Sequence, residues 1–99
     1  MFTVKPFSYI FLAVSADHKR EAVCRQVARI LREERRRRGL SMEALARKAG
    51  LSQAMISFVE REIRNPTLDT LLRITDVLSL DLDEVICRAR QAARIGKLQ

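Results

Sequence analysis

The chain has 99 residues, enough for one domain with one modest core and no more. The formal net charge is +7, and the single histidine, His18, excludes a metal cluster built from several histidines. Cys24 and Cys87 are too few and too far apart for a disulfide framework or a zinc site. We therefore expect buried, reduced thiols in a cytoplasmic protein.

The positive charge is concentrated in one part of the chain. Residues 19–64 carry 13 basic and 6 acidic side chains, whereas residues 1–18 and 65–99 are each neutral overall. A basic half on a small domain is typical of a protein that binds a polyanion such as DNA. A solvated basic surface is the alternative, and charge alone does not decide between the two.

Residues 1–17 are interpreted as an N-terminal arm. Their apolar run, residues 7–14, is far too short to cross a bilayer, so no membrane association is expected. Residues 9–11 favour a strand, which would have to pack on the helices or pair with another chain. The alternatives are a disordered start and a signal peptide, since residues 14–16 resemble a signal-peptidase site. We retain an ordered arm used in dimerisation as the expectation.

Five helices are predicted from residue 18 onwards, so the fold class is all-α over residues 18–99. The first helix spans about His18 to Arg38, and Gly39 is typical of a left-handed C-cap. Its inward face consists of Val23, Val27, Ile30, Leu31 and Glu34, which recur at helical spacing.

The second and third helices lie within residues 39–66, the most informative run of the chain. Ser41 is placed as the N-cap of the second helix, and Gly50 permits a sharp turn. Ser52 then caps a third helix that runs to about Arg61. Two helices so close together must cross steeply, which is the geometry of a DNA-reading helix-turn-helix.

Two further helices follow the break at Asn65-Pro66. Thr67 is placed as the N-cap of the fourth helix, and Asp81 and Glu84 have the capping-box spacing for the fifth. A stripe of small and apolar residues on the fifth helix suits either the core or a dimer interface. It consists of Val85, Ile86, Ala89, Ala92 and Ala93.

Taken together, these residues resemble the phage-repressor and Cro class of helix-turn-helix, the XRE family. The resemblance covers roughly residues 23–85 and implies a compact five-helix domain whose third helix enters the major groove of double-stranded DNA. The residues that carry it are Leu40-Ser41, Leu45-Ala46, Ala49-Gly50-Leu51-Ser52, Ile56-Ser57, Val59-Glu60-Arg61 and Arg64-Asn65-Pro66-Thr67-Leu68-Asp69-Thr70-Leu71.

The resemblance also implies roles for individual residues. Arg35 and Glu60 fall where the family often has a buried ion pair that ties the first helix to the third. Gln53 suits bidentate hydrogen bonding to adenine, and Phe58 either contacts a thymine methyl or tucks under the following loop. The expected base-reading residues are Gln53, Ala54, Ser57 and Phe58. The expected phosphate contacts are Arg38, Ser41, Met42, Ser52, Arg61, Arg64 and Asn65.

Two positions depart from the family pattern. Met42 stands where the family commonly has Gln, which removes one expected phosphate contact. Glu62 stands where the family usually has Gly, so the turn there is expected to be wound differently, and an acid lies near phosphate.

We predict a sequence-specific transcriptional regulator that acts as a homodimer. One recognition helix reads only a few base pairs, and dimerisation through the fifth helix and the arm would create a palindromic operator. The alternative is a protein-interaction module or antitoxin with the same fold, which Met42 and Glu62 favour. The sequence has no Gly-rich phosphate loop, metal-ligand spacing or nucleophile–base pair, so neither enzymatic activity nor a metal or cofactor is expected.

Overall fold

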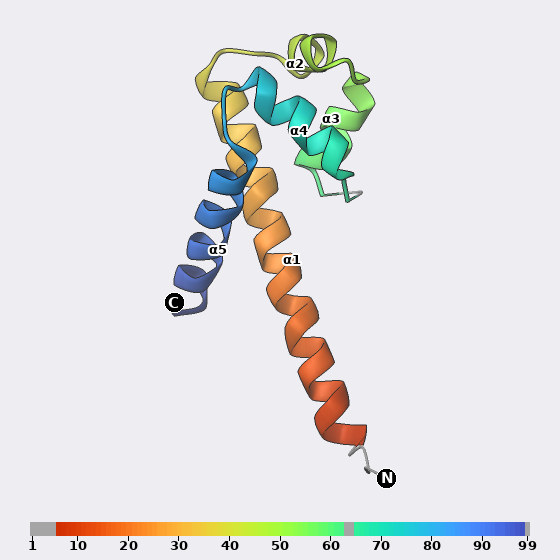
Figure 1. The fold of residues 1–99 in the computed structure, drawn as a ribbon, viewed down its shortest axis with the longest axis vertical. Coiled ribbons are helices and arrows are strands. Elements are labelled where there is room, and N and C mark those ends of the chain that lie inside the picture. The colour runs from red at the N-terminus through yellow and green to blue at the C-terminus, as the bar shows by residue number, and fades with distance from the viewer. Residues whose placement is uncertain (1–5, 63–64, 99) are drawn as a thin grey trace.

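The computed structural model describes residues 6–62 and 65–98, and the side chains of residues 17–62 and 65–96. The described chain is built from five helices and contains no strand, which confirms the all-α five-helix prediction (Figure 1). The helices are α1 (Pro6–Arg37), α2 (Met42–Ala49), α3 (Gln53–Glu60), α4 (Leu68–Val77) and α5 (Leu82–Leu98).

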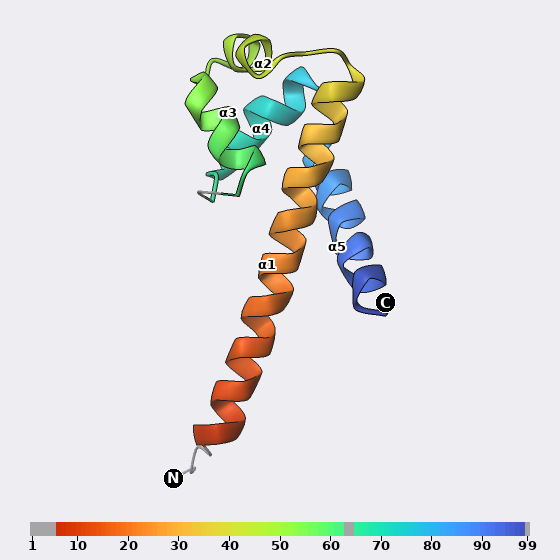
Figure 2. The same cartoon turned by 180° about the vertical axis from the view of Figure 1, so that it is seen from behind.

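The molecule is elongated because α1 is much longer than the other helices. Its 32 residues span about 48 Å at about 1.5 Å per residue, which agrees with a longest dimension of 55 Å. The three short helices α2, α3 and α4 gather at the C-terminal end of α1, whereas the N-terminal part of α1 projects beyond them (Figure 1). Both views place α3 and α5 on opposite sides of α1 (Figure 2).

The strand expected at residues 9–11 is wrong, because α1 is continuous from Pro6 to Arg37. Strand propensity is a weak and context-dependent preference. No Gly or Pro interrupts the chain between residues 6 and 39. Pro6 itself lies in the first turn, where a missing N–H and a fixed φ suit a helix. A helix that forms after residue 17 can therefore extend backwards without a break.

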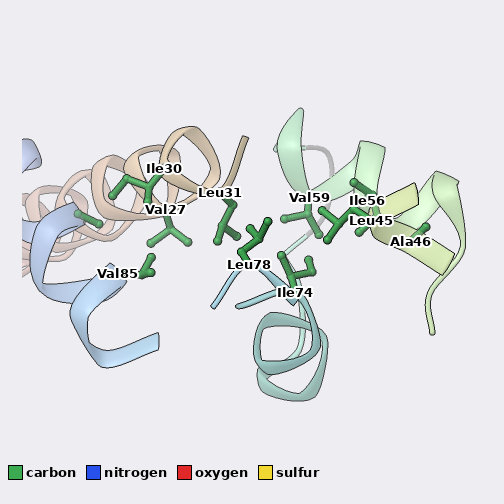
Figure 3. Close-up of a cluster of buried hydrophobic side chains, with 11 residues drawn as sticks. Val27, Ile30, Leu31, Leu45, Ala46, Ile56, Val59, Ile74, Leu78 and Val85 are labelled. Carbon is green, nitrogen blue, oxygen red and sulfur yellow. The ribbon is translucent and has the colours of Figure 1, made fainter. Parts of the chain in front are cut away.

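One hydrophobic core joins all five helices (Figure 3). Leu31, Leu45 and Ile56 are each about 1% exposed, so α1, α2 and α3 meet at its centre. Fully burying one such side chain contributes roughly 1.5–3 kcal/mol. The complete cluster is Val27, Ile30, Leu31, Leu45, Ala46, Ile56, Val59, Ile74, Leu78, Val85 and Ala89.

The burial pattern corrects two expectations. Val85 and Ala89 are completely buried in the core of their own chain, so they are unavailable to a dimer interface. Cys24 and Cys87 are exposed free thiols rather than buried ones. Each cysteine follows an inward-leaning residue by one position, and one step along a helix turns a side chain by roughly 100° away from the core.

Candidate nucleic-acid interface

The N-termini of α2 and α3 are both capped by serine, as the sequence predicted. The Oγ of Ser41 accepts a hydrogen bond from the backbone N–H of Ala44 at 3.0 Å. The Oγ of Ser52 accepts from the backbone N–H of Met55 at 3.1 Å. A cap of this kind leaves other N–H groups of the first turn without a partner inside the helix, and such groups can donate to a phosphate.

The turn between α2 and α3 is fixed by Gly50. Its φ of 71° is left-handed, a conformation that costs a residue with a Cβ about 1–2 kcal/mol. The N–H of Leu51 donates to the carbonyl of Ala46 at 2.9 Å, which closes a Schellman motif at the end of α2. Gly50 therefore provides the sharp turn that the sequence predicted between α2 and α3.

The two faces of α3 differ in burial as the sequence predicted. Ile56 and Val59 lie in the core, whereas Gln53 and Ala54 are exposed at the N-terminal end of the helix. Ser57 and Phe58, the other two predicted base readers, are half-buried. Of the four predicted base readers, the two at the start of α3 are thus the more accessible to a ligand.

A buried ion pair holds α3 against α1, which confirms the predicted contact between Arg35 and Glu60. The Nε of Arg35 donates to Oε2 of Glu60 at 2.6 Å, and Nη2 donates to Oε1 at 2.9 Å. Nη1 of Arg35 donates to the backbone carbonyl of Leu40 at 2.8 Å. One guanidinium therefore joins α1, the loop before α2 and the C-terminal end of α3.

The arginines at the end of α1 are partly neutralised by Glu34. The carboxylate of Glu34 accepts hydrogen bonds from the guanidiniums of Arg37 and Arg38, the latter from Nε at 2.9 Å. The hydrogen bond from Arg37 is the main reason that the pKa of Glu34 lies below its ordinary value, although burial acts in the opposite direction. Arg38, a predicted phosphate contact just beyond α1, is therefore already paired with an acid of the last turn of that helix.

The segment after α3 contains three of the predicted phosphate contacts. Arg61 and Asn65 are exposed, whereas Arg64 lies outside the described residues. Glu62 has a φ of 60°, so it adopts the left-handed conformation that favours glycine. The expectation that the turn is wound differently is therefore wrong: Glu62 adopts the left-handed conformation that a glycine would adopt there. The side chain of Met42 is partly buried and packs against the core.

Arg73 of α4 is a positioning residue that the sequence reasoning missed. Its Nε donates to Oδ2 of Asp69 at 2.8 Å, and its Nη1 reaches the backbone carbonyl of Ala49 at 3.4 Å. The hydrogen bond to the Asp69 carboxylate raises the pKa of the Arg73 guanidinium. The spacing of Asp69 and Arg73 could have indicated their pairing. The contact with Ala49 joins residues 24 positions apart and has no local signal.

In the described part of the chain, no group of three or more histidine, cysteine, aspartate or glutamate side chains could hold a metal ion. None of the described helices is long and apolar enough to cross a membrane.

Known proteins resemble this chain in both sequence and structure. A helix-turn-helix family model (HTH_3) matches residues 31–85. Antitoxin HipB from Escherichia coli (strain K12) is 35% identical over 68 residues, which make up 69% of this chain and 75% of that protein.

Two solved structures share the fold. The clp gene regulator ClgR from Corynebacterium glutamicum has a TM-score of 0.70 at 19% identity, covering 78% of this chain and 82% of that one. The restriction-modification controller protein C.Esp1396I has a TM-score of 0.64 at 27% identity, covering 75% of this chain and 95% of that one. The matched family segment contains α2, α3 and α4 entire, and with them the capped turn and the buried ion pair described above. The chain therefore belongs to the XRE family of helix-turn-helix DNA-binding proteins.

Proposed function

We propose that the chain is a sequence-specific regulator of transcription whose helix α3 enters the major groove of double-stranded DNA. The observation that carries the proposal is the way α3 is held. Ser52 caps its start, Gln53 and Ala54 are exposed beside that cap, and Arg35 fixes its far end through Glu60. A helix held at both ends presents its first side chains to base edges in a fixed geometry.

Gln53 is the principal base reader in this proposal. Its side-chain NH₂ can donate to N7 of adenine while its carbonyl oxygen accepts from the N6 amino group, a bidentate pair that is worth roughly 1–3 kcal/mol of discrimination. Ala54 is suited to a thymine methyl. Ser57 and Phe58 are half-buried, so they contact the DNA only at the edge of the interface.

Phosphate contacts supply most of the affinity. The backbone N–H groups at the starts of α2 and α3, beside Ser41 and Ser52, are positioned as donors. Arg61 and Asn65 add exposed side chains after α3, and Arg64 keeps the role assigned from sequence.

The protein binds as a dimer on a palindromic site in this proposal, because one recognition helix reads too few base pairs. Since Val85 and Ala89 are buried, the interface is assigned to the accessible part of α5 and to the projecting N-terminal part of α1. On α5, Ile95 is 58% exposed, and Ile86, Ala92 and Ala93 are partly accessible.

The decisive experiment is selection of bound sequences from a random duplex library, followed by affinity measurements on the winner across a salt series. We expect a palindromic winner whose affinity falls steeply with salt, since phosphate binding releases counterions. Gln53→Ala should weaken binding roughly 5- to 150-fold, the equivalent of the 1–3 kcal/mol above. Gln91→Ala, an exposed glutamine on α5, is the matched control and should leave the affinity unchanged.

The second candidate function is binding of a protein partner. It is supported by the likeness to a protein named as an antitoxin, by the loss of a polar anchor at Met42 and by the acid at Glu62. No enriched sequence, or weak binding that is insensitive to salt, would reject the regulator proposal in favour of this one.

A further inference from the structure

A groove opens between the middle of α1 and the C-terminal half of α5. The two helices are close together near the C-terminal end of α1 and diverge towards the C-terminus of the chain (Figure 1). The groove has a volume of about 330 Å³. Its described lining is Lys19, Ala22 and Val23 from α1 and Arg90, Ala93 and Arg94 from α5.

The groove combines a small apolar floor with three unneutralised cations. Ala22, Val23 and Ala93 let another chain approach closely. No acidic side chain is among the described lining residues, and neither Lys19 nor the two arginines form an ion pair within the described chain.

Some cations of α1 do have acidic partners. Arg29 pairs with Glu33 at 2.8 Å one turn away, and Arg37 and Arg38 share Glu34. Arg25, Arg32 and Arg36 form no ion pair within the described chain, so the groove is distinguished by the apolar floor that lies between its cations. Cations left unpaired around an apolar floor are complementary to an acidic, amphipathic ligand.

The position of the groove argues against two other occupants. Its α5 wall lies on the opposite side of α1 from α3, so a duplex read by α3 is directed away from it (Figure 2). A second copy placed groove to groove would bring six cations together, and like charges facing each other across an interface are unfavourable.

We propose that this groove docks an acidic amphipathic segment of a protein partner. The apolar side of that segment lies on Ala22, Val23 and Ala93, and its carboxylates pair with Lys19, Arg90 and Arg94. Ala93 therefore belongs to the partner groove, and the homodimer interface is left to Ile86, Ala92, Ile95 and the projecting part of α1. The inference does not depend on DNA binding, because it involves no residue of α2 or α3.

The test uses a labelled helical peptide that has Leu at every third and fourth position and Glu elsewhere. A matched peptide has Gln in place of every Glu. Fluorescence anisotropy with the full chain should show the Glu peptide binding at least about tenfold more tightly than the Gln peptide. Lys19→Glu/Arg94→Glu should remove most of that preference. Lys19→Gln/Arg94→Gln, which removes the two positive charges without adding negative ones, should weaken it.

The matched control is Arg25→Glu/Arg88→Glu, which makes the same charge change on the same two helices outside the groove. It should retain the wild-type preference. Equal losses in the two charge-reversed variants would mean that the peptide is attracted by net charge alone, and the groove proposal would be rejected.

Two further outcomes would also overturn the proposal. If duplex DNA displaces the peptide and the groove variants lose operator binding, the groove is a nucleic-acid surface. If the groove variants change the sedimentation coefficient of the free protein, a second copy fills it. Gln53→Ala must leave peptide binding intact, so failure of the groove is distinguishable from failure of the proposed DNA-binding function.

Discussion

At the scale of single residues, the Arg35–Glu60 ion pair shows how a charge contact can orient a recognition helix. The two side chains are 8% and 3% exposed and meet through two hydrogen bonds. Removing two charges from water is unfavourable, so such a pair contributes little net stability compared with apolar side chains. Its effect is conditional: each charge is tolerated in the interior because the other is present.

Removing one partner should therefore be severe. Glu60→Ala leaves the Arg35 guanidinium buried without a counter-charge and should lower the free energy of unfolding by about 3–5 kcal/mol. Urea unfolding followed by circular dichroism measures the change. Glu33→Ala, which breaks the exposed pair with Arg29, should cost within about 1 kcal/mol. Equal losses from the two variants would show that Glu60 has no special role.

Glu62 is the residue at which stability and ligand binding are expected to improve together. Its left-handed φ costs about 1–2 kcal/mol. Glu62→Gly removes this strain, but the greater conformational freedom of glycine in the unfolded chain offsets part of the gain. We expect unfolding to become about 0.5–1 kcal/mol less favourable, and operator affinity to rise because an acid near phosphate is removed.

Ser79→Gly provides the control for that prediction. Ser79 has a φ of 55° in the turn between α4 and α5 and carries no charge. The substitution should give a similar gain in stability with unchanged operator affinity. If it raised the affinity as much as Glu62→Gly, the electrostatic explanation would be wrong.

At the scale of elements, the helix-turn-helix depends on contacts between the α2–α3 turn and α4. A Cβ added at Gly50 would lie 3.0 Å from Nη1 of Arg73, whereas one added at Gly39 would meet nothing within 4 Å. Both glycines have nearly the same φ, 71° and 70°. The two positions therefore separate the cost of backbone strain from the cost of displacing Arg73.

Gly39→Ala should destabilise the fold by about 1–2 kcal/mol through backbone strain alone. Gly50→Ala should cost more, because the Arg73 side chain must also move and weaken its contact with Ala49. In an Arg73→Ala background the difference between the two should disappear, as measured by thermal unfolding of all the variants. A difference that persists there would place its cause elsewhere in the turn.

The C-terminal turn of α1 should make the stability of the fold depend on pH. The pKa of Glu34 is lowered from an ordinary value of 4.5, first by the hydrogen bond from Arg37, so folding favours its carboxylate form. That contribution is fully present above the unfolded pKa and is lost as pH falls through the folded value. Glu34→Gln should therefore lose less stability than the wild type on acidification below pH 4.5. Parallel pH profiles in urea unfolding would contradict this.

At the scale of the whole molecule, we expect the five-helix core to fold without the projecting N-terminal part of α1. The buried core begins at Val27, with Val23 partly buried before it. Deletion of residues 1–16 should thus leave a folded chain. Its free energy of unfolding should lie within about 1 kcal/mol of that of the full chain, when both are measured at concentrations at which the full chain is monomeric. Analytical ultracentrifugation should show loss of the dimer. A truncated chain that still dimerises would assign the interface to α5 alone.

The sequence was sufficient wherever the determining interactions are local. The caps at Ser41 and Ser52 and the left-handed turn at Gly50 involve neighbours within five residues, so residue type and spacing predict them. The inward face of α3 follows from helical periodicity. The Arg35–Glu60 contact is not local, and it was predicted only because a family resemblance supplied the pairing.

Tertiary structure decided the features that depend on distances between separate elements. It determined that Val85 and Ala89 belong to the core, that Cys24 and Cys87 face solvent, and that Arg73 reaches the end of α2. The physical reason is common to these three: a side chain on a helix has the same sequence pattern whether its face meets another helix or water. The extension of α1 back to Pro6 is a different case, because there a weak local preference for a strand gave way to an uninterrupted helix. The sequence by itself thus determined the helix-turn-helix, and only the packing of α1 and α5 determined which surfaces remain for partners.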